Sequence, residues 1–323
     1  MSSSIVTQTR AESGGYRRAD TMWMRGSFGI SVHWTSQSVR LDGTRLPYEA
    51  AVNAFDSETF AESLAAVGAR HCIFTLTHAE EYLALPHPLL EKLLPGRTTR
   101  RDLIAELIAA LDRRGIRFIA YYNHSCNQHG DAAWEKACGY ADGIHGNLDR
   151  FAENICGIVE FIAKRYGTGL AGWWFDSSYS VDPRGPSNTV SCDMGDWQFP
   201  WRQLSDAGKA GYRDCAVTFN SGLGRSFLYT EYQDYYAGEC GRLDQVFVPE
   251  VRADLCDHRW ICADSPKWVF SAGVQSEGFV PLRFPTEDLR AFRDRHLAEG
   301  RMVTFNILID QSGRLNPVMK QLA

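Results

Sequence analysis

Short apolar runs alternate with amphipathic segments along most of this chain. Runs typical of buried strands occupy Phe28–Trp34, His71–Thr77, Ile116–Tyr122, Gly169–Asp176, Ala216–Asn220, Lys267–Ala272 and Val303–Ile309. Helical patterns lie between them, at Asp56–Gly68, Thr99–Arg114, Leu148–Tyr166, Trp201–Tyr212 and Thr286–Glu299. Strands that alternate with helices predict β–α crossovers and a parallel sheet.

The number of strand–helix units favours a closed barrel over an open sheet. About six to eight units fit into roughly 290 residues, which is typical of a (β/α)8 barrel. No G-x-G-x-x-G motif follows the first strand and no Walker A motif occurs, which disfavours nucleotide-binding α/β folds. We therefore predict a single-domain (β/α)8 TIM-like barrel at residues 23–323, preceded by a flexible polar arm at residues 1–22.

Most of the predicted strands end on polar side chains. In chain order, these are His33 with Trp34, His78, Tyr122 with Asn123, Asp176, Asn220 and, in the last strand, Asn306. The carboxyl ends of barrel strands form the face that carries active sites. Any one of these residues has a simpler interpretation as an ordinary strand-end cap. Their repetition predicts a polar pocket over an apolar core.

The stretch G-W-W-F-D-S-S-Y ends one of these strands on a carboxylate, Asp176. We expect its three aromatic residues, Trp173, Trp174 and Phe175, to form apolar walls for the C–H face of a sugar ring. A carboxylate beside them can attack an anomeric carbon or stabilise an oxocarbenium-like centre, with a second carboxyl group as acid/base. The candidates for that second group are Glu231, Asp234 and Glu239, with Glu80, Glu81 and Glu250 less favoured.

Several of these segments resemble the α-L-fucosidases of glycoside hydrolase family 29, over most of residues 26–310. F-G-I-S-V-H-W at 28–34 is similar to the family's first strand, and W-W-F-D at 173–176 to the strand that bears the nucleophile. The segments at 55–78 and 102–122 resemble the next two units of the barrel. D-Y-Y-A-G-E at 234–239 resembles the segment of the acid/base, and F-N-I-L-I-D-Q-S-G-R-L at 305–315 the final strand and its turn.

This resemblance implies a retaining glycosidase that needs no cofactor and no metal. Asp176 would be the nucleophile, and Glu239 would be the acid/base, with Glu231 as its main rival. Contacts to the sugar are implied for His33, His78, Tyr122 and Trp174. We add Trp34, Asn123 and Asn220 as binding candidates because they stand at the same strand ends.

The chain also departs from the family pattern. Ala79 replaces the second of two adjacent histidines, the Glu-Trp-Tyr element after the first strand is absent, and the arginine expected near Asn220 is missing, with Arg225 as a substitute. The chain ends just past the last strand, so we expect no C-terminal β-sandwich. Lost hydroxyl contacts reduce sugar discrimination, which favours a small, unusual glycoside. Two alternatives remain: a glycosyl-transferring or tailoring enzyme of small-molecule metabolism, and a non-catalytic carbohydrate-binding protein.

Charge and composition disfavour some classes of binding partner. The net charge is −5, from 34 basic and 39 acidic residues, which disfavours nucleic-acid binding. No run reaches 18 apolar residues and the N-terminus lacks an apolar signal region, so we expect no membrane contact and a cytoplasmic location. Nine cysteines without a C-x-x-C pair are expected to be reduced. His124, Cys126 and His129 have metal-ligand chemistry, but their spacing matches no strong zinc signature. The sequence leaves the oligomeric state open.

Overall fold

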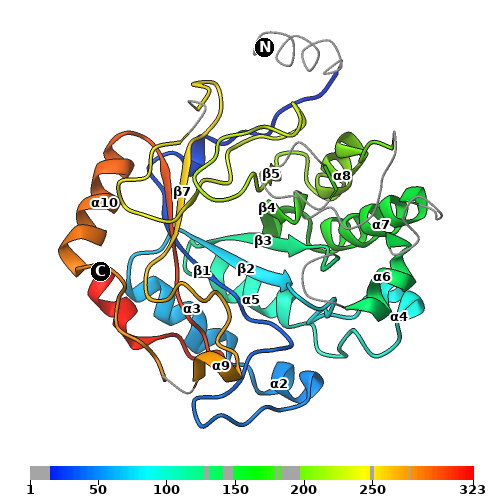
Figure 1. The fold of residues 1–323 in the computed structure, drawn as a ribbon, viewed down its shortest axis with the longest axis horizontal. Helices are drawn as coiled ribbons and strands as arrows, with labels where there is room; N and C mark the ends of the chain where they lie inside the picture. The colour runs from blue at the N-terminus through cyan, green and yellow to red at the C-terminus, as the bar shows by residue number, and fades with distance from the viewer. Residues whose placement is uncertain are drawn as a thin grey trace.

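The computed structural model describes residues 15–126, 131–140, 148–178, 181–182, 197–247, 251–275 and 278–323. At its centre lies one sheet of eight parallel strands: β1 (Phe28–Val32), β2 (His71–Thr77), β3 (Arg117–Asn123), β4 (Leu170–Asp176), β5 (Ala216–Phe219), β6 (Glu239–Cys240), β7 (His258–Cys262) and β8 (Met302–Asn306). The spatial order β5-β4-β3-β2-β1-β8-β7-β6 follows the chain order around a ring. The predicted (β/α)8 TIM-like fold is confirmed (Figure 1).

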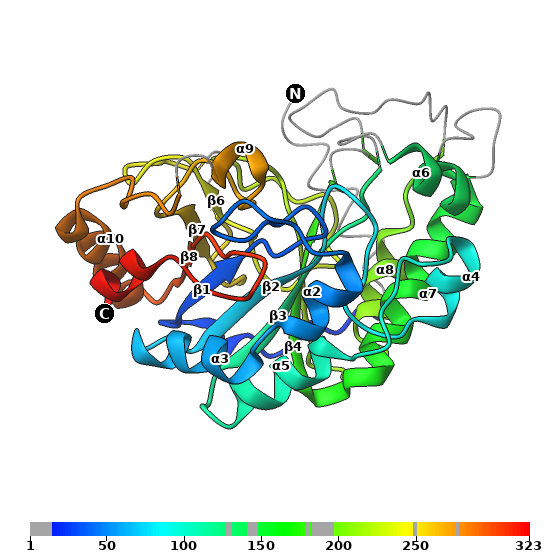
Figure 2. The ribbon, with the colours of Figure 1, turned by 90° about the horizontal axis from the view of Figure 1, so that it is seen from below.

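Helices cover the outside of the curled sheet, as Figure 2 shows. They are α2 (Tyr48–Ala54), α3 (Ser57–Ala66), α4 (Pro88–Leu93), α5 (Leu103–Asp112), α6 (Ala132–Cys138), α7 (Leu148–Tyr166), α8 (Trp201–Gly208), α9 (Ala272–Gln275) and α10 (Thr286–Ala298). Asp56 caps α3, because its side chain accepts from the amides of Glu58 and Thr59. Asp102 caps α5, since its carboxylate accepts from the amide of Ala105. None of the helices in the described ranges is long and apolar enough to cross a membrane.

Hydrogen bonds of backbone and side-chain groups join β5 to the segment just before β6. These two regions are the ends of the strand order given above. The amide of Asp234 donates to the carbonyl of Val217 over 2.7 Å. The Asp234 carboxylate in turn accepts from the Val217 amide at 2.8 Å, and the Thr218 hydroxyl donates to the carbonyl of Tyr235 at 2.7 Å. These bonds connect β5 to the segment before β6 where regular strand pairing is absent from the described residues. They hold the segment that leads to Glu239, at the start of β6, beside β5.

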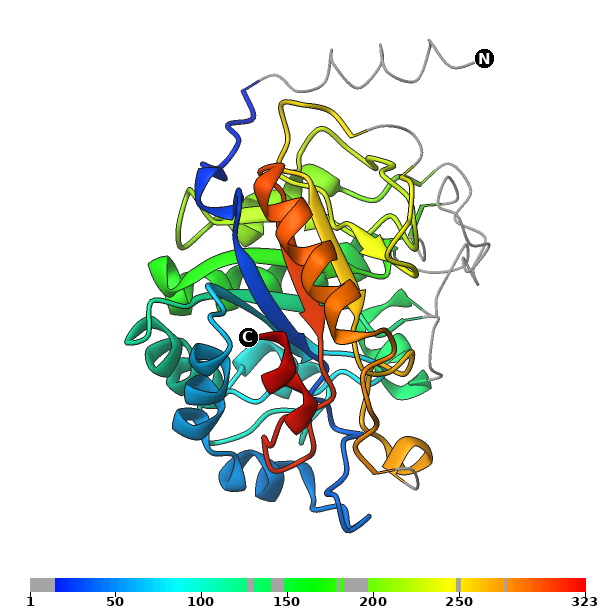
Figure 3. The ribbon, with the colours of Figure 1, turned by 90° about the vertical axis from the view of Figure 1, so that its left-hand side faces the viewer.

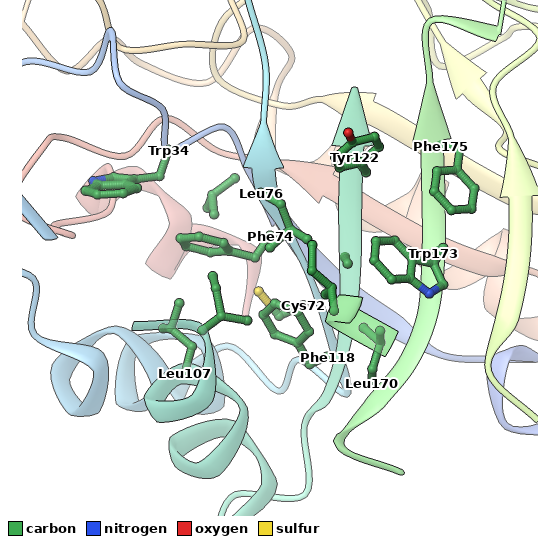
Figure 4. Close-up of a cluster of buried hydrophobic side chains, with 14 of the residues drawn as sticks. Trp34, Cys72, Phe74, Leu76, Leu107, Phe118, Tyr122, Leu170, Trp173 and Phe175 are labelled. Carbon is green, nitrogen blue, oxygen red and sulfur yellow. The ribbon is translucent and has the colours of Figure 1, made fainter. Parts of the chain in front are cut away.

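The strands separate two apolar layers, because successive side chains point to opposite faces. The outer layer fills the space between strands and helices, and Figure 4 shows part of it, with Trp34, Phe74, Tyr122, Trp173 and Phe175 among its members. The inner layer fills the barrel and includes Ile73, Ile119, Tyr121, Trp174, Tyr235 and Trp260. Which layer a residue joins decides whether it can reach the pocket.

One level of the barrel interior is polar. The hydroxyl of Thr304 lies 2.8 Å from the Nε2 atoms of both His71 and His258, and Ser27 lies 2.8 Å from Nδ1 of His71. Burial lowers the pKa of His71 to about 3, so the ring is neutral. A Cβ at Gly29 would come within 2.2 Å of this ring, so this position on β1 requires glycine.

Three expectations differ from the structure. The strand predicted at Lys267–Ala272 is wrong: only Val269 there forms an isolated bridge, to His33. No strand was predicted at β7, because the polar His258 and Arg259 interrupt its apolar pattern. Residues 15–22, expected within the flexible arm, are instead bonded to the barrel, for example through the amide of Ala19, which donates to the Asp234 carboxylate at 2.9 Å.

Candidate active site

Two carboxyl groups, those of Asp176 and Glu239, meet on the side chain of Asn220. Asp176 is the last residue of β4, Asn220 follows β5, and Glu239 begins β6. The side-chain amide of Asn220 donates to Asp176 Oδ1 at 3.0 Å and to Glu239 Oε2 at 2.9 Å. Two N–H bonds of one amide diverge by about 120°, which places these oxygen atoms roughly 5 Å apart. Asn220 therefore sets the spacing of the pair.

The two carboxyl groups differ in their environment. Burial, together with the charge of Asp176, raises the pKa of Glu239 to about 7, and the hydrogen bond from Asn220 opposes this shift. A large fraction of Glu239 is therefore protonated near neutral pH. Two neighbouring carboxyl groups, one of them held partly in its acid form, suit a division of labour between a nucleophile and an acid.

Aromatic rings form the floor beneath the pair. The hydroxyl of Tyr121 donates to Asp176 Oδ2 at 2.5 Å. The Tyr121 ring stacks on Trp174 with centroids 5.1 Å apart and planes at 16°, and Trp174 lies 6.0 Å from Trp260. This floor is rigid and apolar, and the Tyr121 hydroxyl with the Asn220 amide fixes the orientation of the Asp176 carboxylate.

Two histidines stand beside this floor. The ring of His33 lies 5.3 Å from that of His78 and 4.8 Å from that of Tyr121, and its Nδ1 is 2.9 Å from the Asn306 side-chain oxygen. Burial lowers the pKa of His33 to about 4, so its imidazole is neutral at physiological pH. A neutral imidazole can donate and accept hydrogen bonds, as sugar hydroxyls require. Trp268, 43% exposed, lies 6.3 Å from His78 at the rim.

The aromatic candidates Tyr122 and Trp34 lie elsewhere, as do Trp173 and Phe175. All four belong to the outer layer (Figure 4). The Tyr122 hydroxyl donates to Glu81 at 2.7 Å, and the indole of Trp34 donates to the carbonyl of Gln311 at 3.1 Å. Adjacent strand residues face opposite sides of the sheet. Tyr121, and not Tyr122, is therefore positioned for the sugar contact that was expected of Tyr122.

Asn123 is fully buried, and its side-chain oxygen bonds to two serines that follow β3 and β4. Its side-chain oxygen accepts from the hydroxyl of Ser177 at 2.5 Å and from the amide of Ser125 at 2.8 Å. Ser125 and Ser177 both have left-handed backbones, with φ of 58° and 63°. Such conformations cost about 1–2 kcal/mol each. Asn123 thus joins the loops after β3 and β4 and holds the residue that follows Asp176.

The rival carboxyl groups have other partners. Glu231 pairs with Arg18 and Arg252, and Asp234 pairs with Lys209 at 2.8 Å. Glu80 accepts from the hydroxyl of Ser36 at 2.6 Å. The carbonyl of Arg225 accepts from the hydroxyl of Ser221 at 2.9 Å, and the role of this arginine as a substitute stays a prediction. Glu250 and His129 lie outside the described residues, and within these no cluster of three metal-ligating side chains occurs.

The pairing register of β3 and β4 indicates that Tyr121 faces the barrel interior. Tyr121 pairs with Trp174 and Asn123 pairs with Asp176 across β3 and β4. If Asp176 points into the barrel, so does Trp174 two residues earlier, and so does its partner Tyr121. Tyr122, one residue later on β3, therefore faces the opposite side of the sheet.

Part of the chain is similar to a known protein family. The family described as alpha-L-fucosidase matches residues 46–196, which include His78 and Asp176. Residues 46–196 are thus similar to the α-L-fucosidases. The matched part does not include His33 or Glu239, which the fold brings to the site. A search of curated proteins finds no significant match.

Solved structures of fucose-processing enzymes share the fold. The endo-fucoidan hydrolase MfFcnA4 of glycoside hydrolase family 107 superposes with a TM-score of 0.67 at 16% identity, over 93% of this chain and 52% of that one. A trapped covalent intermediate of a family 29 α-L-fucosidase from Bacteroides thetaiotaomicron superposes with a TM-score of 0.59 at 15% identity, over 93% of this chain and 72% of that one. The chain thus spans about half of the first enzyme. Together with the family match, these similarities support a glycoside hydrolase.

Proposed function

We propose that this protein is a retaining glycoside hydrolase that cleaves an α-L-fucosyl or closely related glycosidic bond. The observation that supports this proposal most is the pair Asp176 and Glu239 on one asparagine amide. Carboxyl groups about 5–5.5 Å apart are typical of retaining glycosidases, whereas inverting enzymes need about 6.5–9.5 Å to admit a water molecule. The spacing inferred from the two bonds of Asn220 supports the first class.

The two carboxyl groups have complementary roles in this proposal. Asp176 attacks the anomeric carbon while the O–H of Glu239 protonates the departing glycosidic oxygen, which yields a glycosyl-enzyme ester and the free aglycone alcohol. Glu239, now a carboxylate, takes a proton from water as that water attacks the anomeric carbon and releases Asp176. Two inversions restore the original anomeric configuration.

The remaining side chains fit sugar binding. Trp174 and Tyr121 offer an apolar surface to the C–H face of the ring. Neutral His33 and His78 can bond to ring hydroxyls, and the exposed Trp268 extends the aromatic surface toward an aglycone. Since Ala79 stands where the family carries a second histidine, we infer a small glycoside rather than a fucosylated polymer as the substrate.

The test is turnover of 4-nitrophenyl glycosides, with α-L-fucoside, β-D-galactoside and β-L-arabinoside in parallel. Wild type is compared with Asp176→Gly in the presence and absence of azide. We expect turnover of the α-L-fucoside, retained configuration of the first-formed sugar by NMR, loss of turnover in Asp176→Gly, and its recovery as a glycosyl azide. Addition of alcohols as acceptors separates hydrolysis, which gives free sugar, from transfer, which gives a new glycoside.

Turnover that survives in Asp176→Gly without azide, or inverted configuration of the first product, would contradict the mechanism. Binding of a glycoside without turnover by wild type would contradict catalysis and favour a carbohydrate-binding protein.

A further inference from the structure

A cavity of about 700 Å³ lies at the end of the barrel opposite to Asp176. Residues just before β1, β7 and β8 line it, together with the last turn of α10. Figure 3 shows α10 beside β8, with β1 and β7 on either side. The volume is within the range of small-molecule sites. Because the amino ends of the strands form this opening, the cavity is separate from the carboxyl pair.

Arginine dominates the lining of this cavity. Five arginines contribute to it: Arg25, Arg252, Arg259, Arg295 and Arg301. The carboxylates in the lining are Asp257 and Glu299. The whole chain, by contrast, has a net charge of −5, so the cavity is a local concentration of positive charge on an acidic protein.

Only part of this charge is balanced by ion pairs. Asp257 bonds to Arg259 and Arg301, and Arg301 also contacts Glu299. Arg252 pairs with Glu231 and Asp254, which lie outside the lining. In the described ranges, Arg25 and Arg295 form no ion pair.

Arg259 provides independent evidence that this cavity is suited to an anion. The residue is 7% exposed, and its Nε–H is buried with no hydrogen-bond partner in the described part of the chain. The guanidinium lies 4.2 Å from the centre of the Phe247 ring, which fixes its plane. Buried polar groups normally have a partner, and a donor of an arginine facing a cavity is satisfied best by an oxyanion.

His296 reports the same excess of charge. Burial, together with the positive charges of Arg259, Arg301 and Arg295, lowers its pKa to about 3. The cavity thus presents five arginines and a neutral imidazole against two carboxylates, Asp257 and Glu299.

We propose that this cavity binds a small multivalent oxyanion, of the phosphate-ester or sulfate-ester class, through Arg25, Arg259 and Arg295. The planar guanidinium groups match the paired oxygen atoms of phosphate and sulfate. The site is independent of the carboxyl pair, so its ligand is an effector or an anionic partner molecule rather than the glycoside that the other end of the barrel holds.

The experiment is isothermal titration of the full-length protein with pyrophosphate, inorganic phosphate and sulfate, at constant ionic strength to exclude general screening. The variant is Arg25→Gln/Arg295→Gln, and both of its sites are exposed, so the fold is preserved. The matched control is Arg100→Gln/Arg113→Gln, which removes the same charge from exposed positions away from the cavity. The midpoint of thermal unfolding with and without pyrophosphate gives a second measurement.

We expect saturable binding of pyrophosphate to wild type and to the control, and at least about tenfold weaker binding to the cavity variant. Pyrophosphate should raise the unfolding midpoint of wild type more than that of the cavity variant. Relative affinities for phosphate and sulfate identify the ester class. Absence of binding by wild type, or equal affinities of the cavity variant and the control, overturns the proposal. Neither result depends on glycosidase activity.

Discussion

Neighbouring aromatic residues on β3 and β4 lie on opposite sides of the barrel wall. Tyr121 and Trp174 stack inside the barrel, where Tyr121 donates to Asp176. Tyr122 and Trp173, one residue away on the same strands, pack outside against the helices, where Tyr122 donates to Glu81. Each tyrosine thus holds a carboxyl group, but only the inner one reaches the pocket. Under the proposed function the inner tyrosine assists catalysis and the outer one contributes to stability, and substitutions at the two positions test this difference.

The largest effect is expected at the inner carboxylate. Asp176→Gly should lower kcat by roughly 10⁴-fold or more, because the nucleophile is lost while the aromatic floor remains. Azide should restore turnover with the substituted enzyme and leave wild type unaffected. The unfolding midpoint should change little. A comparable loss of kcat in Phe175→Leu, on the outer face, would show that the assay reports folding rather than chemistry.

Glu239→Gln should lower kcat/KM about 10²–10⁴-fold for substrates with poor leaving groups, since the proton donor is removed. For wild type, kcat/KM should fall as pH rises above about 7, because the raised pKa of Glu239 marks the loss of its proton. This alkaline decline should be absent in the variant. The matched control is Glu231→Gln, which removes a rival carboxylate paired with Arg252 and should keep the wild-type pH profile.

Smaller effects are expected at the two tyrosines, on kcat for Tyr121 and on the free energy of unfolding for Tyr122. Tyr121→Phe should lower kcat about 10- to 100-fold, because a hydrogen bond to a charged group contributes about 1.5–3 kcal/mol. Tyr122→Phe should leave kcat unchanged and lower the free energy of unfolding by about 1–3 kcal/mol, since it leaves the Glu81 carboxyl buried without its donor. Steady-state kinetics and denaturant titration on both variants decide the matter. Equal effects of the two substitutions on kcat would refute the division between faces.

The smallest effect concerns the outer carboxyl group. Burial raises the pKa of Glu81 to about 8 in the folded protein. A raised carboxyl pKa means that stability is fully present below the unfolded pKa and is lost as pH rises toward 8, at up to about 1 kcal/mol per pH unit. Glu81→Gln should flatten this decline in chemical denaturation between pH 5 and pH 8, whereas the exposed Glu287→Gln should not. An unchanged slope in Glu81→Gln would show that the group ionises freely.

The sequence by itself determined the order of the main elements. Helix α7 at Leu148–Tyr166 and strand β2 at His71–Thr77 match their predicted bounds, because their apolar periodicity is long and unbroken. The resemblance of W-W-F-D to the nucleophile strand also placed Asp176 at the carboxyl end of β4, where the structure has it. Local pattern and local chemistry coincide in these segments, so no tertiary information was needed.

Only the tertiary structure decided which polar groups meet. Glu239 was one of several loop carboxyl groups until the ring closure at Asp234 and Val217 carried it to Asn220, 19 residues away in sequence. The choice between Tyr121 and Tyr122 required the strand register, because both precede the same strand end. The arginine cavity gathers residues from 25 to 301, and no local pattern announces it. Periodicity is a property of one segment, whereas the spacing of two charges depends on how the barrel brings distant segments together.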